Sequence, residues 1–208
     1  MNLITVYHGA SIEVGNPSLA YGRDDADFGS GFYVTREAEM AEKWASRKNN
    51  SIVNVYEIDL DNLNGIEFGI DKGWLDFVVQ NRSGNKRIEI EMTNVDYISG
   101  ATADDRLFAI IEQYEDNLID VDTAIQAMNA MKIGNQISLI SENGISNLKF
   151  INSYVLSPER KSELKQLNVQ MRKETNEVVE RVLKNRMKEK NETPAPQPII
   201  HKKRKIKS

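Results

Sequence analysis

Residues 27–35 have the sequence Asp-Phe-Gly-Ser-Gly-Phe-Tyr-Val-Thr, which joins a glycine-rich turn to a short apolar strand. Glycine before a strand lets a ligand or another backbone come close, because it has no side chain. The ring of Tyr33 offers a face on which a planar ligand can stack, while its hydroxyl can still form a hydrogen bond. This stretch therefore predicts a strand over residues 31–35 with a ligand site at its start.

A second short strand precedes this stretch and ends at Tyr7-His8-Gly9. The segment between the two strands, residues 10–31, is a long loop, and long loops inside compact domains are often functional. A histidine beside glycine can hydrogen-bond a flat ligand that the backbone approaches closely. We expect His8, Gly9 and Tyr33 to line one pocket that fits a small aromatic amide. The alternative is that His8 is a hydrogen-bonded buried histidine and Tyr33 a core aromatic residue.

The rest of the chain alternates between helical and extended patterns without a strict order, which predicts an α+β fold. Thr35 is a good N-cap for a helix that runs to about residue 49. Further strands are expected at residues 52–58, 87–92, 95–99, 136–140 and 150–156, and further helices at 74–79, 104–114, 121–131 and 142–148.

The C-terminal part begins with Ser157-Pro158, a helix-start signal, and then contains no glycine or proline up to about residue 190. We expect a domain over residues 1–157, a long helix over 158–190 and a disordered basic tail over 191–208. The thin apolar stripe of the helix fits two interpretations. The helix either packs on the domain or is offered to a partner or a second copy.

Charge is divided unevenly along the chain, whose net charge is -4. Residues 1–157 contain 24 acidic and 12 basic residues, whereas residues 158–208 contain 15 basic and 7 acidic ones. This division predicts an acidic body with a basic arm. Three contacts fit this arm, namely nucleic acid, a membrane surface or the acidic body itself, and the alternative is a purely solubilising tail. A nucleic-acid contact would use its most basic positions: Lys202, Lys203, Arg204 and Lys205.

Composition excludes several classes of protein. The chain has no cysteine, so it has no disulfide, no thiolate nucleophile and no cysteine-bound metal. It has two histidines, His8 and His201, which argues against a histidine-rich metal site. No apolar run approaches the roughly 18 residues that span a bilayer, and no signal peptide is visible. We therefore expect a cytoplasmic protein without a metal or a membrane partner.

Five motifs occur in the same order as in a known superfamily: Tyr7–Gly9, Asp27–Thr35, Ala41–Ala45, Ala103–Arg106 and Asn135–Ser138. Together they resemble the ADP-ribosyltransferase superfamily, in the branch that contains diphtheria toxin and the poly(ADP-ribose) polymerases. The likeness is closer to an uncharacterised bacterial family of that superfamily, and it covers about residues 3–156. It implies split antiparallel sheets with inserted helices, NAD as substrate and no metal.

The resemblance also implies roles for single residues. His8 would hydrogen-bond the ribose on the adenosine side of NAD, and the Gly9 backbone would hold the nicotinamide carboxamide. Tyr33 would stack on the nicotinamide ring, with Gly31 and Phe32 in the same cofactor-binding site. Two interpretations exist for Arg106: it lies near the NAD phosphates, paired by Asp105, or residues 104–106 cap the helix that follows.

The catalytic position departs from the superfamily. A glutamate on a late strand usually contacts the nicotinamide ribose, and the matching residue here is Gln136. A neutral amide can hold the ribose 2′-hydroxyl, but it cannot supply a negative charge or act as a general base. We therefore expect single-unit transfer with Gln136 and Tyr33 as the catalytic residues. Glu89 and Glu91 imitate a Glu-x-Glu strand, and we interpret them as a solvated edge strand.

These implications predict an NAD-dependent mono-ADP-ribosyltransferase that acts on a protein or nucleic acid. By resemblance it would be a toxin or defence effector that an antitoxin restrains. The alternative is a catalytically inactive module that binds NAD, another nucleotide or nucleic acid. If Gln136 converges with His8 and Tyr33 in one cleft, the enzyme is favoured; if it points elsewhere, the module is favoured.

Overall fold

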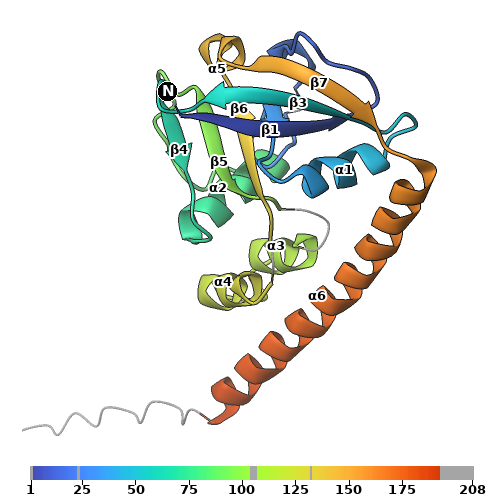
Figure 1. Cartoon of the computed structure of the whole chain (residues 1–208). Helices are drawn as coiled ribbons and strands as arrows, with labels where there is room; N and C mark the ends of the chain where they lie inside the picture. Colours follow the sequence, from blue (N-terminus) through green and yellow to red (C-terminus); the bar gives the residue numbers. More distant parts are fainter. Residues whose placement is uncertain (1, 23, 104–106, 132, 193–208) are drawn as a thin grey trace, which may run out of the picture.

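The computed structural model describes residues 2–22, 24–103, 107–131 and 133–192. It has a mixed α+β fold with two sheets, a layer of helices and a long C-terminal helix (Figure 1). No helix among the described residues is both long enough and apolar enough to cross a lipid bilayer. The predicted α+β class is therefore confirmed.

One sheet has three antiparallel strands in the order β1-β3-β7: β1 (Leu3–Ala10), β3 (Ile52–Asp59) and β7 (Lys149–Val155). The other has the order β2-β6-β5-β4: β2 (Phe32–Val34), β6 (Asn135–Leu139), β5 (Tyr97–Ala101) and β4 (Gly65–Glu67). In this second sheet β4 runs parallel to β5, and the other pairs are antiparallel. The sheets touch at their edges through an isolated bridge between Tyr7 and Thr35.

The space between the sheets is filled by alternate residues of their strands, because successive side chains of a strand point to opposite faces. This first core contains Val6, Phe32, Val34, Tyr56, Ile58, Ile137 and Leu139. The helices α2 (Lys72–Ser83), α3 (Phe108–Glu115) and α4 (Val121–Asn129) cover the far face of the four-stranded sheet. There a second core contains Phe28, Trp74, Val78, Ile98, Ile110 and Met128.

The helix α1 (Ala38–Ser46) packs against β1, and the long helix α6 (Pro158–Glu192) crosses both α1 and α4 (Figure 1). Leu164 of α6 is fully buried against α1, and Val179 belongs to the core beside α4. Arg160 joins the two helices by donating from Nε and Nη2 to Glu42 Oε2 at 2.9 and 2.7 Å. This part of α6 therefore packs on the body. The remaining short elements are the 3-10 helix η1 (Leu19–Tyr21) and α5 (Glu142–Ser146).

The predicted edge strand over residues 87–92 is wrong, because this segment forms no strand. The backbone N–H groups of Arg87 and Ile88 donate to Gln80 Oε1 of α2 at 2.8 and 3.1 Å. Ile88 and Ile90 are partly buried against the helical core. A side chain of α2 thus holds the backbone groups that an adjacent strand would otherwise pair.

Two expectations fall on residues that the structure does not describe. Arg106 and its neighbours at 104–105 lie outside the described residues, and α3 begins at Phe108. The basic tail lies outside them from residue 193 onward, including Lys202, Lys203, Arg204 and Lys205.

Candidate functional site

The candidate site lies where β1 and β2 separate beyond the Tyr7–Thr35 bridge. At the bridge, Tyr7 N donates to Thr35 O at 2.8 Å and Thr35 N donates to Tyr7 O at 3.0 Å. One residue further along β1, a side chain replaces the backbone pairing: His8 Nδ1 lies 2.7 Å from the Tyr33 carbonyl oxygen. A carbonyl oxygen only accepts, so Nδ1 carries the proton and Nε2 is left as an acceptor.

Burial of the His8 ring disfavours its charged form. Burial lowers the pKa of His8 below its ordinary value of 6.5, while its bond to the Tyr33 carbonyl opposes the shift and the charge of Lys48 adds to it. The ring stacks on Phe32 with a centroid distance of 4.4 Å and an angle of 28° between the planes. Phe32 belongs to the core between the sheets, so the His8 ring lies on that side of β2.

The Tyr33 ring lies on the opposite side of β2, against the helical core and near Phe28. Its hydroxyl accepts a hydrogen bond from Phe28 N at 3.0 Å and donates one to Gly29 O at 2.7 Å. The expectation that the His8 and Tyr33 rings line one pocket is therefore wrong. Phe32 and Tyr33 are neighbours in a strand, so their side chains face opposite sides of the sheet. The His8 ring lies on the Phe32 side because it stacks on Phe32.

Gly9 and Gly31 are both required for close packing. A Cβ atom on Gly9 would meet the Ala41 carbonyl oxygen and would lie 2.6 Å from Ala45 N, so α1 packs directly on the β1 backbone. Strand alternation turns the Gly9 N–H and C=O toward β2, as it does those of Tyr7. A Cβ atom on Gly31 would meet Ser138 Oγ and would lie 2.9 Å from Leu139 O of β6. Gly31 thus lets the chain approach β6 of the same sheet, and Phe32 packs in the core between the two sheets.

Gln136 is buried at the start of β6, where its Nε2 atom donates to Asp27 Oδ2 at 2.6 Å. The register pairs Tyr33 with Ser138, so Gln136, two residues before Ser138, shares a sheet face with Tyr33. It does not share that face with the His8 ring. The structure therefore brings Gln136 and Tyr33 to one side of β2 and leaves His8 on the other.

Asp27 is the centre of a buried polar cluster that the sequence did not single out. Its Oδ1 atom accepts from Arg82 Nε at 2.8 Å and forms an ion pair with Arg82 Nη2 at 2.6 Å, while Nη2 donates to the Ala103 carbonyl oxygen. Its Oδ2 atom accepts from Ala103 N at 2.8 Å and from Gln136. Burial raises the pKa of the Asp27 carboxyl, and Arg82 opposes this. The sequence signal was an aspartate in a glycine-rich loop, but its partners lie in other parts of the chain.

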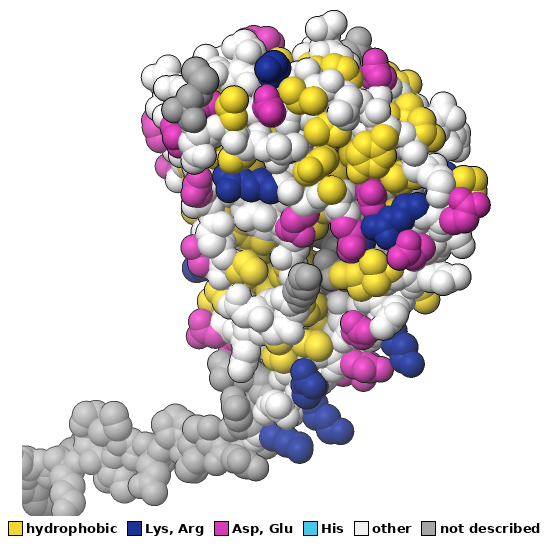
Figure 2. Space-filling model, in the orientation of Figure 1, with side chains coloured by type: hydrophobic (Ala, Val, Ile, Leu, Met, Phe, Trp, Pro, Cys, Tyr) yellow, Lys and Arg dark blue, Asp and Glu magenta, His cyan; other side chains and the backbone are white. Residues whose placement is uncertain are grey.

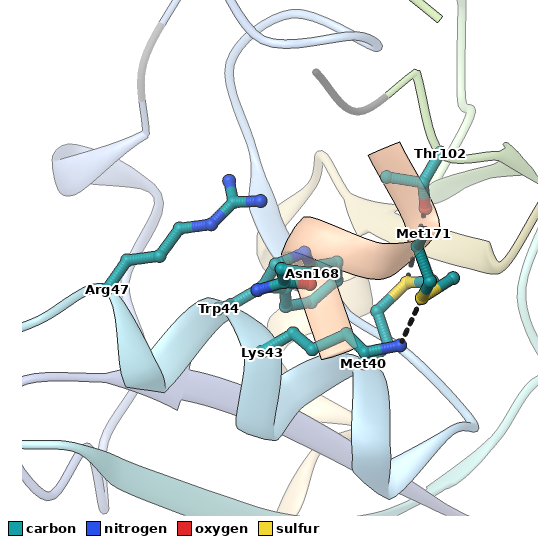
Figure 3. A pocket seen from close by; sticks show the side chains of 7 residues that line it. All are labelled: Met40, Lys43, Trp44, Arg47, Thr102, Asn168 and Met171. Carbon is teal, nitrogen blue, oxygen red and sulfur yellow. Dashed lines mark hydrogen bonds between the residues drawn. The ribbon is translucent and has the colours of Figure 1, made fainter. Parts of the chain in front are cut away.

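A cavity of about 30 Å³ lies between α1, the end of β5 and α6 (Figure 3). It is lined by Met40, Lys43, Trp44, Arg47, Thr102, Asn168 and Met171. Lys43 Nζ lies 3.5 Å from Met171 Sδ, and the Arg47 side chain points away from this group (Figure 3). The volume suffices for a water molecule only. Trp44 lines this cavity and also packs against Gly9, so α1 separates the cavity from the candidate site. Asn168 and Met171 of α6 line the other side of the cavity.

The two glutamates of the Glu-x-Glu pattern lie on the surface, away from Asp27. Glu89 is exposed and paired with Lys86, and Glu91 is exposed and accepts from Thr93. Figure 2 shows hydrophobic side chains over the three-stranded sheet and Lys and Arg side chains along the lower part of α6. Within the described residues, no three His, Asp or Glu side chains gather closely enough to hold a metal ion.

One comparison with known proteins gives a match. A family model described as a protein of unknown function (DUF3990) matches residues 4–150, which is more than half of the chain. No curated protein and no solved structure matches the chain. The matched segment ends inside β7, so the whole of α6 lies beyond it.

Proposed function

We propose that the chain, which belongs to the DUF3990 family, binds NAD and transfers one ADP-ribose unit to a macromolecule. The observation that carries this proposal is the separation of β1 and β2 beyond the Tyr7–Thr35 bridge. The His8 ring and the Gly9 backbone lie beside this gap, while the Tyr33 ring lies on the other side of β2. Two sheets that meet at this edge support the split-sheet fold that the five motifs imply.

In this proposal NAD crosses the gap, and its two halves lie on opposite sides of β2. His8 accepts a hydrogen bond at Nε2 from the adenosine ribose, for which its neutral form is the right one. The Gly9 backbone holds the carboxamide. Tyr33 and Gln136, which share the other face, flank the nicotinamide ring and its ribose. This placement replaces the single pocket that the sequence suggested.

The chemistry asked of the site is cleavage of a glycosidic bond. The bond between ribose C1′ and the nicotinamide nitrogen breaks, and its electron pair leaves with nicotinamide, which becomes neutral. The positive charge moves to the ribose as an oxocarbenium-like centre. An acceptor oxygen or nitrogen then bonds to C1′ and loses its proton to solvent. The protein contributes mainly positioning and electrostatic stabilisation.

The site must open before NAD can enter. Ligand pockets of this kind measure about 300–1,000 Å³, whereas the cavity behind Gly9 measures about 30 Å³. Gly9 and Gln136 are also buried. Helix α1 covers Gly9, and Asp27 of the loop before β2 contacts Gln136. We propose that binding moves at least one of these two elements.

The alternative, a nucleotide-binding module without activity, is favoured by one observation. The Gln136 amide is buried, uncharged and on a different face from His8. The resemblance that suggests transfer also suggests a toxin or defence role with an antitoxin. The charge of residues 202–205 separately suggests contact with nucleic acid.

Incubation of the purified chain with NAD labelled in its adenylate half, together with a cell extract, tests the proposal. We expect label on macromolecules and free nicotinamide in equal amounts, and separate protease and nuclease digestion identifies the acceptor class. Binding of NAD without release of nicotinamide would establish the module instead. Absence of both binding and release would overturn the transferase and the NAD-binding module.

A further inference from the structure

We propose that Asp27 is a positioning residue that orients the Gln136 amide and supplies the negative charge that Gln136 itself lacks. The inference rests on the proposed function, because it concerns the group that contacts the nicotinamide ribose. It is carried by the hydrogen bond from Gln136 Nε2 to Asp27 Oδ2, which measures 2.6 Å and joins residues 109 positions apart.

The direction of this bond fixes which end of the amide is left for a ligand. A carboxylate only accepts, so the Gln136 nitrogen must face Asp27, and Oε1 is the atom that remains. Oε1 is a hydrogen-bond acceptor, as a glutamate oxygen at the same place would be. Among the described residues, the fully buried side-chain atoms without a hydrogen-bond partner are Arg87 Nε and Ser138 Oγ. Gln136 Oε1 is therefore not a fully buried acceptor without a partner.

Burial raises the pKa of the Asp27 carboxyl, whereas its hydrogen bonds and the charge of Arg82 favour the ionised form. Every contact to its carboxylate comes from a donor: two from Arg82, one from the Ala103 backbone and one from Gln136. A protonated carboxyl would have to give up one of these contacts, because its O–H needs an acceptor. Arg82 binds Oδ1 and Gln136 binds Oδ2, so the arginine does not compete for the oxygen that holds the amide.

A negative charge one hydrogen bond away strengthens the amide as an acceptor. Hydrogen bonds in a chain polarise one another, and the effect is larger in a buried site of low dielectric constant. Oε1 would thus hold the ribose 2′-hydroxyl more tightly as positive charge develops at C1′. A glutamate would put its negative charge next to the ribose. Here the charge of Asp27 acts on the ribose through the polarised Gln136 amide.

Exchange of the two side chains separates this role from simple anchoring of the loop. Asp27→Asn removes the charge, whereas Asp27→Asn combined with Gln136→Glu restores one carboxylate and one amide in reversed positions. We expect kcat for nicotinamide release to fall on the order of 10²-fold in Asp27→Asn with KM little changed. In the double variant we expect kcat to return to within about tenfold of the parent.

The matched control is Asn81→Ala. Asn81 Nδ2 donates to the Asp27 backbone oxygen at 3.1 Å, so this variant loosens the same loop without touching the carboxylate. It should lower the melting temperature and leave kcat within a few-fold of the parent. If kcat of Asn81→Ala falls as far as that of Asp27→Asn, the role of Asp27 is anchoring alone and the inference is overturned.

The outcomes also separate the inference from the function on which it rests. A parent chain that releases no nicotinamide refutes the proposed function. A parent that is active, with an Asp27→Asn variant that is equally active, refutes the inference alone. If Asp27→Asn does not fold, the double variant decides: a folded double variant that is 10²-fold slower than the parent overturns the proposal.

Discussion

Replacement of Tyr33 by phenylalanine removes one oxygen atom and keeps the ring. The hydroxyl accepts from Phe28 N at 3.0 Å and donates to Gly29 O at 2.7 Å. Each such bond contributes roughly 0.5–1.5 kcal/mol net, and both backbone partners lose their protein partner. We therefore expect Tyr33→Phe to lower the free energy of unfolding by about 1–3 kcal/mol. At this chain length, each kcal/mol corresponds to about 2–4 °C in melting temperature.

Urea unfolding followed by circular dichroism measures this change. The slope of the free energy against urea should be unchanged, since the surface exposed on unfolding is the same. Tyr154→Phe is the comparison, because it removes a single hydroxyl contact, 3.2 Å to the Glu42 carboxylate, and leaves the turn before β2 untouched. A loss below about 0.5 kcal/mol in Tyr33→Phe would show that the hydroxyl does not hold the turn before β2.

Three further substitutions test other contacts. Gly9→Ala places a methyl group against the Ala41 carbonyl oxygen and should lower the free energy of unfolding by about 2 kcal/mol or more in urea; unchanged stability would contradict the packing of α1 on β1. Ser138→Ala removes a buried hydroxyl without a partner and should raise stability by up to about 1 kcal/mol, where a clear loss would reveal a missing partner. Folding lowers the pKa of His8, so the free energy of unfolding should be constant above pH 6.5 and should fall as the pH drops below it. His8→Asn should reduce this pH dependence, measured by urea unfolding at several pH values. An equal pH dependence in both proteins would exclude His8 as its source.

Most of the strands could be predicted because their pattern is local. Alternating apolar residues indicated β1, β3, β6 and β7, whose bounds differ little from the expected ones. The segment over residues 87–92 has the same alternation but forms no strand, because the Gln80 side chain holds its backbone. That contact is tertiary, and periodicity alone cannot reveal it.

The sequence suggested residues for the candidate site but could not give their arrangement. The motifs indicated His8, Gly9, Tyr33 and Gln136, yet the sequence does not tell which of two adjacent aromatic residues faces which core. The side of β2 taken by the His8 ring depends on where Phe32 packs. Asp27 lies 109 positions before Gln136, so their hydrogen bond has no local signal.

The most direct test of the central claim is single-turnover release of nicotinamide, with NAD affinity measured on the same samples. The parent chain and Gln136→Ala should bind NAD with similar affinity, because the amide matters most as the glycosidic bond opens. Release by the variant should be slower by about 10²-fold or more. If the parent neither binds NAD nor releases nicotinamide, or if Gln136→Ala releases it at the parent rate, the account of this site is contradicted.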